Sequence, residues 1–199
     1  MAAFIASLVV RDRECLVVGG DREAAEKAAR LVEAGARVRV VAPVIVHALR
    51  AMAQRQVVRW SERAFDPAMD LVPAPFVVIS TVLDDAFSER LHADARAVGA
   101  IVCCVDQPAR CDFFHTAQGA VGALTLAVAS EGRAPALARA LRDQLVAGLD
   151  APMRTLSEAL VALRAETPRE ARRGRMAEAL RDLRVEVRVH LPAWLRARD

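Results

Sequence analysis

A glycine pair between a short apolar run and a helical pattern constrains this chain more than any other feature. Residues Glu14–Val18 are typical of a buried strand, Gly19 and Gly20 end it, and apolar residues then recur at helical spacing. A strand, a glycine turn and a helix in this order open a dinucleotide-binding βαβ unit. Glycines let a pyrophosphate approach the backbone, and the helix N-terminus offers free N–H groups. We therefore expect Gly19 and Gly20 to bind a nucleotide.

Asp21 departs from this fingerprint, which has glycine at its position so that no side chain projects toward the phosphates. Its carboxylate would place negative charge at an anion site, and the next residue, Arg22, would pair with it or hold a phosphate. Alternatively, Asp21 is the N-cap of the helix, a role that aspartate performs well. The sequence leaves two interpretations open: a helix cap, or a retained but weakened nucleotide site.

Strands and helices alternate through the first half of the chain, which predicts a Rossmann-like parallel sheet with helices on both faces. The expected strands are Glu14–Val18, Val38–Val41, Val57–Trp60, Phe76–Thr81 and Ile101–Val105. The expected helices are Arg22–Ala34, Val44–Gln54 and Asp85–Val98, with residues 65–75 as a loop. Ligands of such sheets bind beyond the carboxyl ends of the strands. We therefore expect Ala42, Pro43, Thr81 and Val82 to complete the nucleotide site.

The pattern changes after Pro108, and from about Asp112 onward we expect a largely helical region. The expected elements are strands at Cys111–Phe114 and Leu124–Ser130 and helices at Pro135–Leu149, Pro152–Ala165 and Arg169–Val189. The last two helices carry arginine-rich faces beside apolar stripes. An exposed apolar stripe on terminal helices would suit a dimer.

Composition excludes several classes of protein. The net charge is only +3, and no basic cluster with interleaved aromatic residues indicates a nucleic-acid partner. No apolar run approaches the ~20 residues of a membrane span, so we expect a cytoplasmic protein with no membrane partner. The four cysteines lack the two-residue spacing of a structural zinc site, and the adjacent Cys103 and Cys104 should face opposite sides of a strand. Reduced thiols are expected in the cytosol.

Several ordered segments resemble the precorrin-2 dehydrogenase/sirohydrochlorin ferrochelatase family, the small bifunctional module of siroheme synthesis. The likeness covers roughly residues 4–149 and includes "VVGG", "LVEAGARVRVVAP", "VDQPARCDFF" and "ASEGRAPALARALR". The resemblance implies a Rossmann-type NAD-binding domain over residues 1–111 and a dimerisation and tetrapyrrole-cleft region over 112–150. A helical C-terminal domain over 151–199 would complete a homodimer.

The resemblance also implies an activity: an oxidoreductase that uses NAD to oxidise precorrin-2, a tetrapyrrole, to sirohydrochlorin. In many members it implies a second step, a lyase reaction in which Fe2+ is inserted as substrate. Asp106 matches the family's acid–base aspartate and is also a tentative metal contact; without the resemblance it is a turn residue. The expected substrate-binding residues are His115, Ser130, Gly132, Arg133 and Arg139. Arginine forks suit carboxylate side chains, although Arg133 and Arg139 are equally typical of a helix surface.

Departures from the family pattern concentrate on the nucleotide side, at Asp21, Val82, Leu83 and Cys103. The residues expected around the macrocycle are better kept. A dehydrogenase-deficient chelatase, or a tetrapyrrole-binding or regulatory homodimer of the same fold, is therefore the alternative to an NAD-dependent dehydrogenase.

Overall fold

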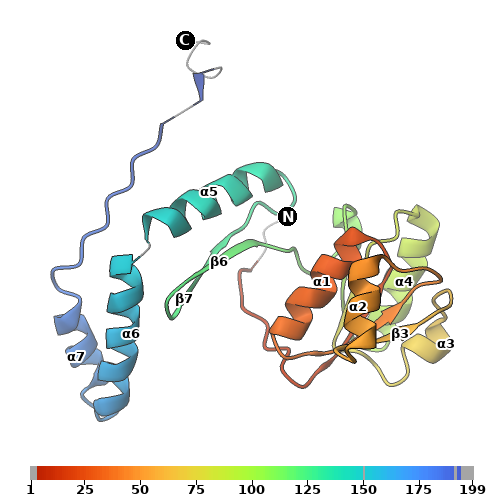
Figure 1. Ribbon diagram of the computed structural model, residues 1–199, viewed down its shortest axis with the longest axis horizontal. Coiled ribbons are helices and arrows are strands. Elements are labelled where there is room, and N and C mark those ends of the chain that lie inside the picture. Colours follow the sequence, from red (N-terminus) through yellow and green to blue (C-terminus); the bar gives the residue numbers. More distant parts are fainter. Residues whose placement is uncertain (1–3, 150, 191, 194–199) are drawn as a thin grey trace. The chain divides into compact units, whose positions relative to one another are not determined.

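The computed structural model describes residues 4–149, 151–190 and 192–193, which form two compact units. The first unit comprises residues up to 117 together with 127–141. The second comprises residues 118–126 and the described residues from 142 onward. Figure 1 shows the elements of each unit.

A five-stranded parallel sheet forms the centre of the first unit, in the order β3-β2-β1-β4-β5. Its strands are β1 Glu14–Val18, β2 Arg37–Val41, β3 Val58–Ser61, β4 Val77–Ser80 and β5 Ile101–Cys104. In the central strand, Val17 is in register with Val40 of β2 and with Ile79 of β4. All four pairings are parallel, and the α/β fold predicted from the alternation of strands and helices is confirmed.

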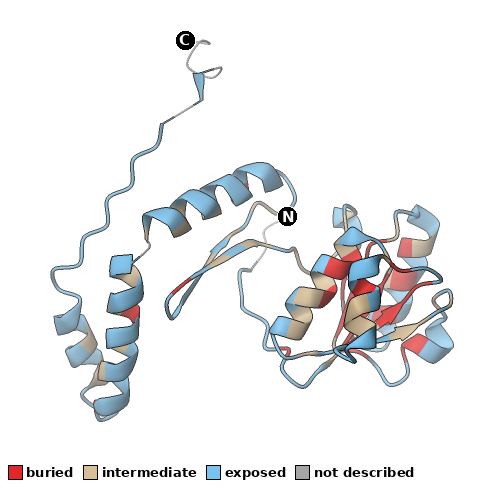
Figure 2. Ribbon diagram, in the orientation of Figure 1, coloured by how far each residue is buried: buried red, intermediate tan, exposed pale blue. Residues whose placement is uncertain are grey.

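Helices cover both faces of this sheet because its strands are apolar on both sides. Helices α1 (Arg22–Glu33) and α2 (His47–Gln54) pack on one face, where Val17 and Val40 meet Ala24 and Leu49. Helix α4 (Asp85–Ala97) packs on the other face through residues that include Leu91. Figure 2 shows the buried residues gathered in these three layers.

Two segments of the first unit differ from the sequence-based expectation. Helix α2 begins at His47 rather than Val44, because the Val46 N–H donates to the Gly20 carbonyl (2.8 Å) and Val46 itself is extended. The expected loop contains a short helix, α3 (Pro67–Asp70), which is capped by Asp66. Asp70 is 1% exposed and accepts both arms of the Arg63 guanidinium at 2.6 and 2.7 Å.

The second half of the chain contains a β-hairpin as well as helices. A 3-10 turn (Pro108–Arg110) precedes the hairpin strands β6 (Ala117–Val121) and β7 (Leu124–Val128). Helices α5 (Pro135–Gly148), α6 (Ala151–Glu166) and α7 (Arg172–Ala179) follow.

The expected elements of this half need two corrections. The strand expected at Cys111–Phe114 is only an isolated antiparallel bridge between Cys111 and Cys103, while β6 was not expected. The last helix ends at Ala179 rather than Val189. Its expected C-terminal part alternates exposed valines with charged residues, a spacing of two that does not suit a helix. Among the described residues, every helix is too short or too polar to cross a lipid bilayer.

Candidate nucleotide-binding site

An apolar pocket of about 390 Å³ lies at the carboxyl ends of β1, β2 and β4. Its lining residues are Val18, Gly19, Gly20, Val41, Ala42, Pro43, Val44, Ala64, Phe65, Val82 and Phe87. Five of the eight residues predicted to bind the cofactor are therefore here, whereas Asp21, Arg22 and Thr81 lie outside the lining. The pocket stands where ligands of open parallel sheets bind, and its volume is within the range of small-molecule sites.

Close packing requires the glycine pair at the mouth of this pocket. Gly19 has φ +131°, and a Cβ there would lie 2.2 Å from the Thr81 hydroxyl oxygen. A Cβ at Gly20 would lie 1.9 Å from the Val44 carbonyl oxygen. Both distances are far below van der Waals contact, so the turn cannot accept a larger residue. The glycines allow the carboxyl ends of β1, β2 and β4 to meet, whatever ligand the pocket holds.

Asp21 is the N-cap of α1, one of the two interpretations that the sequence left open. Its Oδ1 accepts hydrogen bonds from the Ala24 N–H (2.8 Å) and from the Thr81 hydroxyl (3.0 Å). Arg22 pairs with Glu26 (3.3 Å) rather than with Asp21. The positive end of the helix therefore already carries a carboxylate, which ties the glycine turn to the end of β4.

Two aromatic rings that the sequence reasoning missed form the far side of the pocket. The rings of Phe65 and Phe87 meet edge to face, with centroids 5.9 Å apart. Phe87 belongs to the first turn of α4, and its N–H donates to the N-cap residue Asp84 (2.6 Å). Nothing in the local pattern distinguishes these residues from core phenylalanines, because the 61–66 loop that carries Phe65 is placed by long-range packing.

Asp106 stands beside the pocket on the loop that follows β5. The residue is exposed, has φ +59°, and its carboxylate makes no hydrogen bond or ion pair within the described part of the chain. The next residue, Gln107, donates from Nε2 to the Val82 carbonyl oxygen (3.3 Å), and Val82 lines the pocket. The Val105 N–H donates to the Ser80 carbonyl at 2.8 Å. These bonds hold the backbone of the Asp106 loop next to Val82 and Ser80, while Asp106 itself is not among the residues that line the pocket.

The residues predicted to bind substrate lie on two segments of the chain, at residue 115 and over residues 130–139. A Cβ added at Gly132 would be 4.0 Å from Pro108 Cγ, so the loop that begins at Ser130 lies next to the Asp106 loop. Arg133 pairs with Glu131 at 3.3 Å, and its side chain is 80% exposed. Arg139 is also exposed, on α5. Both guanidinium groups are accessible to a carboxylate ligand.

His115 follows Phe113, and the two rings meet edge to face with centroids 5.4 Å apart. His115 is exposed, but protein atoms close to its ring desolvate the imidazole, and this desolvation, followed by the positive charges of Lys27 and Arg30, lowers the pKa of His115. The imidazole is therefore neutral at pH 7. Among the described residues, no three His, Cys, Asp or Glu side chains form a group that could hold a metal ion.

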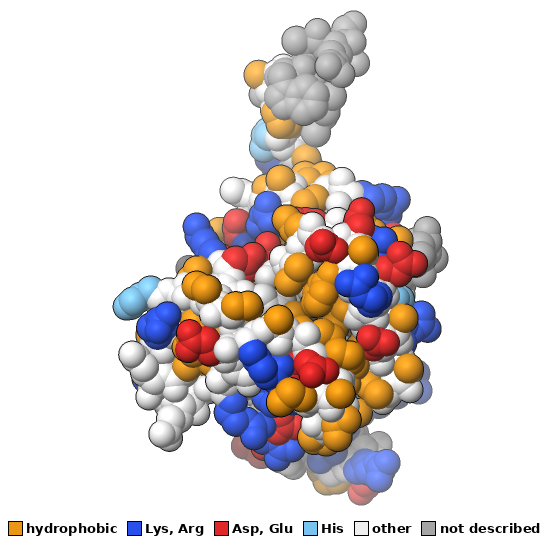
Figure 3. All heavy atoms as spheres, turned by 90° about the vertical axis from the view of Figure 1, so that its right-hand side faces the viewer, with side chains coloured by type: hydrophobic (Ala, Val, Ile, Leu, Met, Phe, Trp, Pro, Cys, Tyr) orange, Lys and Arg blue, Asp and Glu red, His pale blue; other side chains and the backbone are white. Residues whose placement is uncertain are grey.

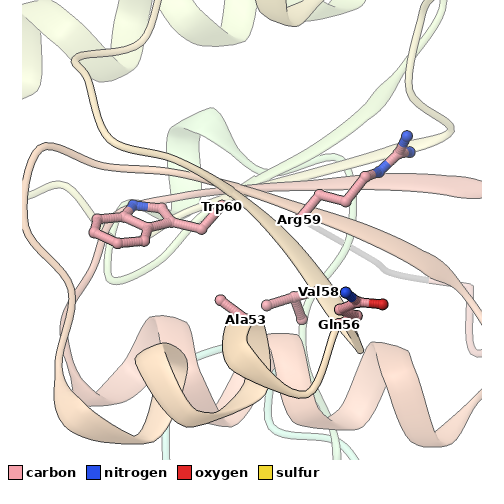
Figure 4. Close-up of a pocket in the computed structure, with 5 residues that line it drawn as sticks. All are labelled: Ala53, Gln56, Val58, Arg59 and Trp60. Carbon is pink, nitrogen blue, oxygen red and sulfur yellow. The ribbon is translucent and has the colours of Figure 1, made fainter.

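A second pocket, of about 470 Å³, lies between α2 and the edge strand β3. Figure 4 shows its lining residues, Ala53, Gln56, Val58, Arg59 and Trp60. The Trp60 indole donates to the Ala42 carbonyl (3.0 Å) and Arg59 donates to both Glu14 carboxylate oxygens (2.8 Å). Its polar groups thus serve the fold. On the face shown in Figure 3, hydrophobic side chains gather among acidic and basic ones, and neither sign of charge dominates.

Comparison with known proteins places the chain in a family. A family model described as "Putative NAD(P)-binding" matches residues 6–117, more than half of the chain. Siroheme synthase 1 of Klebsiella pneumoniae is 36% identical over 149 residues, which are 75% of this chain and 31% of that protein. Siroheme synthase of Thiobacillus denitrificans is 40% identical over 139 residues, 69% of this chain and 28% of that protein. The chain thus spans about a third of the length of the curated relatives it matches.

A solved structure supports the fold independently. SirC, a precorrin-2 dehydrogenase, superposes with a TM-score of 0.72 over 90% of both chains, at 20% sequence identity. That identity establishes a common fold rather than a common activity. The match of the family model over residues 6–117 identifies the family. The chain belongs to this NAD(P)-binding family, and the relationship to the precorrin-2 dehydrogenase family expected from its sequence is confirmed.

Proposed function

We propose that this protein is an NAD-dependent dehydrogenase that oxidises precorrin-2 to sirohydrochlorin in siroheme synthesis. The observation that carries the proposal is the joint position of two features: a pocket beside the glycine turn, and an exposed, unpaired Asp106 on the loop whose Gln107 donates to the pocket residue Val82. The siroheme synthase relatives and the NAD(P)-binding family support the pathway and the class of cofactor.

The residues of the pocket fit a nicotinamide dinucleotide. The apolar walls accept a flat ring, and the turn at Gly19 and Gly20 has no side chain to obstruct a ligand. Gly19, Gly20, Ala42, Pro43 and Val82 would hold the cofactor, and its phosphates would lie at the N-terminus of α1 beside the Asp21 cap. When bound, NAD supplies the acceptor for the hydride that leaves the reduced macrocycle.

Asp106 would remove the proton that must leave the macrocycle together with that hydride. Its carboxylate is exposed and unpaired in the described residues, so no internal ion pair competes for its lone pairs. A positioned carboxylate of this kind is suited to general-base catalysis. Ferrochelation, in which Fe2+ is a substrate, would use the same group to take pyrrole protons.

The substrate-binding side would consist of the segments next to the Asp106 loop. Arg133 and Arg139 would pair with the carboxylate side chains of the tetrapyrrole, and the neutral His115 would accept a hydrogen bond. Ser130 and Gly132, on the loop that precedes α5, would complete the substrate-binding side. In this proposal, residues 1–111 bind the cofactor, residues 112–150 form the dimerisation and tetrapyrrole region, and residues 151–199 form the helical domain of a homodimer.

Turnover of precorrin-2 tests the proposal directly. With NAD present, the protein should produce sirohydrochlorin and NADH in equal amounts, both followed by absorbance. Asp106→Asn is the matched variant, because asparagine keeps the shape of the side chain and tolerates the positive φ of this position. Loss of oxidation in that variant, with wild-type NAD binding, is expected; full activity would remove Asp106 from the mechanism. Adding Fe2+ in a parallel assay measures chelation separately.

The Asp21 carboxylate favours a second candidate function, a tetrapyrrole-binding protein or chelatase without the dehydrogenase step. A negative charge at the N-terminus of α1 opposes a pyrophosphate at that position. Calorimetric titration with NAD distinguishes the two functions, because the second predicts binding of sirohydrochlorin without binding of NAD.

A further inference from the structure

Cys103 and Cys111 form a close cross-strand pair at the outer edge of the sheet. Cys103 lies on β5, the edge strand, and Cys111 is its antiparallel bridge partner. The Asp112 N–H donates to the Val102 carbonyl (2.7 Å), so this backbone hydrogen bond joins the residues next to the two cysteines. Cys103 and Cys111 are therefore a non-hydrogen-bonded pair of the antiparallel bridge. Cα atoms of such pairs lie about 4.5 Å apart, which is within the span of a disulfide. The two sulfur atoms are already only 3.8 Å apart.

The surroundings of the four cysteines make Cys111 the reactive thiol. Cys111 is half-buried, while the other three are buried. The hydrogen bond between Cys103 and Cys111 lowers the pKa of Cys111, and the same bond together with burial raises the pKa of Cys103. Burial raises the pKa of Cys15 and of Cys104 to about 11. A thiolate therefore forms first at the one sulfur that solvent reaches.

We propose that Cys103 and Cys111 are a redox-active dithiol, which a small-molecule disulfide such as oxidised glutathione converts reversibly into an intramolecular disulfide. The Cys111 thiolate attacks one sulfur of the oxidant, forms a mixed disulfide and releases one glutathione thiolate. The Cys103 thiol loses its proton, attacks Cys111 Sγ and displaces the second glutathione thiolate. Two electrons pass from the protein to the oxidant, and the two released thiolates take up the two protons. This inference does not depend on the proposed dehydrogenase activity.

The disulfide would close a ring around the Asp106 loop. In the reduced form, the Cys111 sulfur lies 3.1 Å from the Cys104 carbonyl oxygen and 3.4 Å from the Gln107 carbonyl oxygen, and its single S–H can donate to either. Oxidation removes this donor, but both carbonyls keep a backbone partner, the N–H groups of Gln107 and Arg110. The loop thus retains its turn in the folded protein while the disulfide joins its two ends. In the unfolded chain, the same disulfide lowers the conformational entropy of this loop. Oxidation is therefore expected to stabilise the loop that carries Asp106.

Peptide mapping of the oxidised protein tests the proposal. The full chain is equilibrated in glutathione redox buffers, alkylated, denatured and digested with trypsin. Cleavage after Arg96, Arg110 and Arg133 places Cys103 and Cys104 in one peptide and Cys111 in the next. The expected product is these two peptides joined by a disulfide, in a monomer-derived species that has lost two hydrogen atoms. Dithiothreitol should reverse the link, and the oxidised protein should melt several degrees higher.

Matched variants identify the sulfur that pairs with Cys111. Cys104 is next in sequence, but it packs on the α4 side of the sheet, where its thiol lies 3.9 Å from the Ser88 carbonyl. Cys104→Ala should keep the link, whereas Cys103→Ala and Cys111→Ala should abolish it. Three results on the wild-type chain would overturn the proposal: a stable glutathione adduct at Cys111 without the link, a disulfide between two chains, or no oxidation at the potential of the most oxidising buffer. If a variant fails to fold, fragmentation of the linked wild-type peptides by tandem mass spectrometry assigns the sulfur instead, and a link from Cys111 to Cys104 would likewise overturn the proposal.

Discussion

Replacing Asp21 by asparagine separates its charge from its role as a helix cap. The carboxylate accepts hydrogen bonds from the Ala24 N–H and the Thr81 hydroxyl, and an amide oxygen can accept both. Asparagine is as good an N-cap as aspartate, so the glycine turn should remain tied to β4. The variant loses only the attraction between the carboxylate and the helix dipole, about 0.3–1 kcal/mol. Its melting temperature should fall by less than about 4 °C.

The same change should strengthen NAD binding. A unit charge 4 Å from another contributes about 1 kcal/mol in water and about 4 kcal/mol at an effective dielectric constant near 20. Asp21 is exposed, so the lower part of this range applies, and screening by salt reduces it further. Removing a repulsion of about 1–2 kcal/mol would lower the dissociation constant roughly 5- to 30-fold.

Calorimetric titration of NAD into both proteins at low and high salt measures this effect. The advantage of Asp21→Asn should shrink at high salt, because the repulsion is electrostatic. Glu33→Gln is the matched control: it removes the same charge from an exposed residue of α1, about 18 Å further along the helix, where the effect should vanish. An unchanged or weaker affinity in a folded Asp21→Asn protein would show that the carboxylate does not oppose the cofactor.

Three further changes test the fold and the site. Asp106→Asn should abolish the oxidation of precorrin-2 and shift the melting temperature by no more than about 1 °C, because the carboxylate is exposed and unpaired in the described residues. Asp70→Asn should reduce the free energy of unfolding by about 2–4 kcal/mol at pH 7, as measured by urea denaturation, because it breaks the buried fork with Arg63. Burial raises the pKa of Asp70, but Arg63 and the Asp66 N–H outweigh this effect and hold that pKa below its usual range. The stabilisation by Asp70 is therefore present above about pH 4, which is the pKa of an aspartate in the unfolded chain, and it is lost as pH falls through the pKa of Asp70 in the folded protein. The free energies of unfolding of the wild-type protein and the variant should therefore converge in acid. Ser157→Ala should reduce the free energy of unfolding by about 1–2 kcal/mol in the same assay, because the Ser157 hydroxyl accepts a hydrogen bond from the Ala123 N–H (3.0 Å) and joins the hairpin turn to α6. Thr155→Ala, which changes an exposed residue of the same helix, is the control.

The sheet was predictable because its strands are continuous runs of buried residues. β1 and β4 are buried on both faces, which gives uninterrupted apolar stretches that glycine, proline or a capping aspartate ends. β6 (Ala117–Val121) lacks such a signal, because it contains Gly119 and buries only Val121. A Cβ at Gly119 would lie 2.5 Å from Val146 Cγ2, so this glycine allows β6 to pack closely against α5. No local sequence pattern reveals that contact.

The sequence predicted those residues of the candidate site whose place is set by the order of strands and turns. It did not predict those that long-range packing brings to the pocket. The glycine turn and the ends of β2 and β4 lie at the pocket because a parallel sheet brings its carboxyl ends together. Phe65 and Phe87 reach the same pocket from a loop and a helix that are distant in sequence. The pair Cys103 and Cys111 is equally invisible in the sequence, since the chain leaves β5 and turns through residues 105–110 before it returns to the edge of that strand.

The glycine turn shows why its presence alone does not establish a cofactor. Gly19 is required by the approach of Thr81 and Gly20 by the approach of Val44, so selection for packing would retain both even if no nucleotide were bound. Asp21 is different, because another capping residue would serve the helix without placing a charge at its positive end. The dehydrogenase and the binding-only functions therefore differ chiefly in what this one carboxylate does to a phosphate, and the charge-removal experiment decides between them more sharply than any change to the glycines.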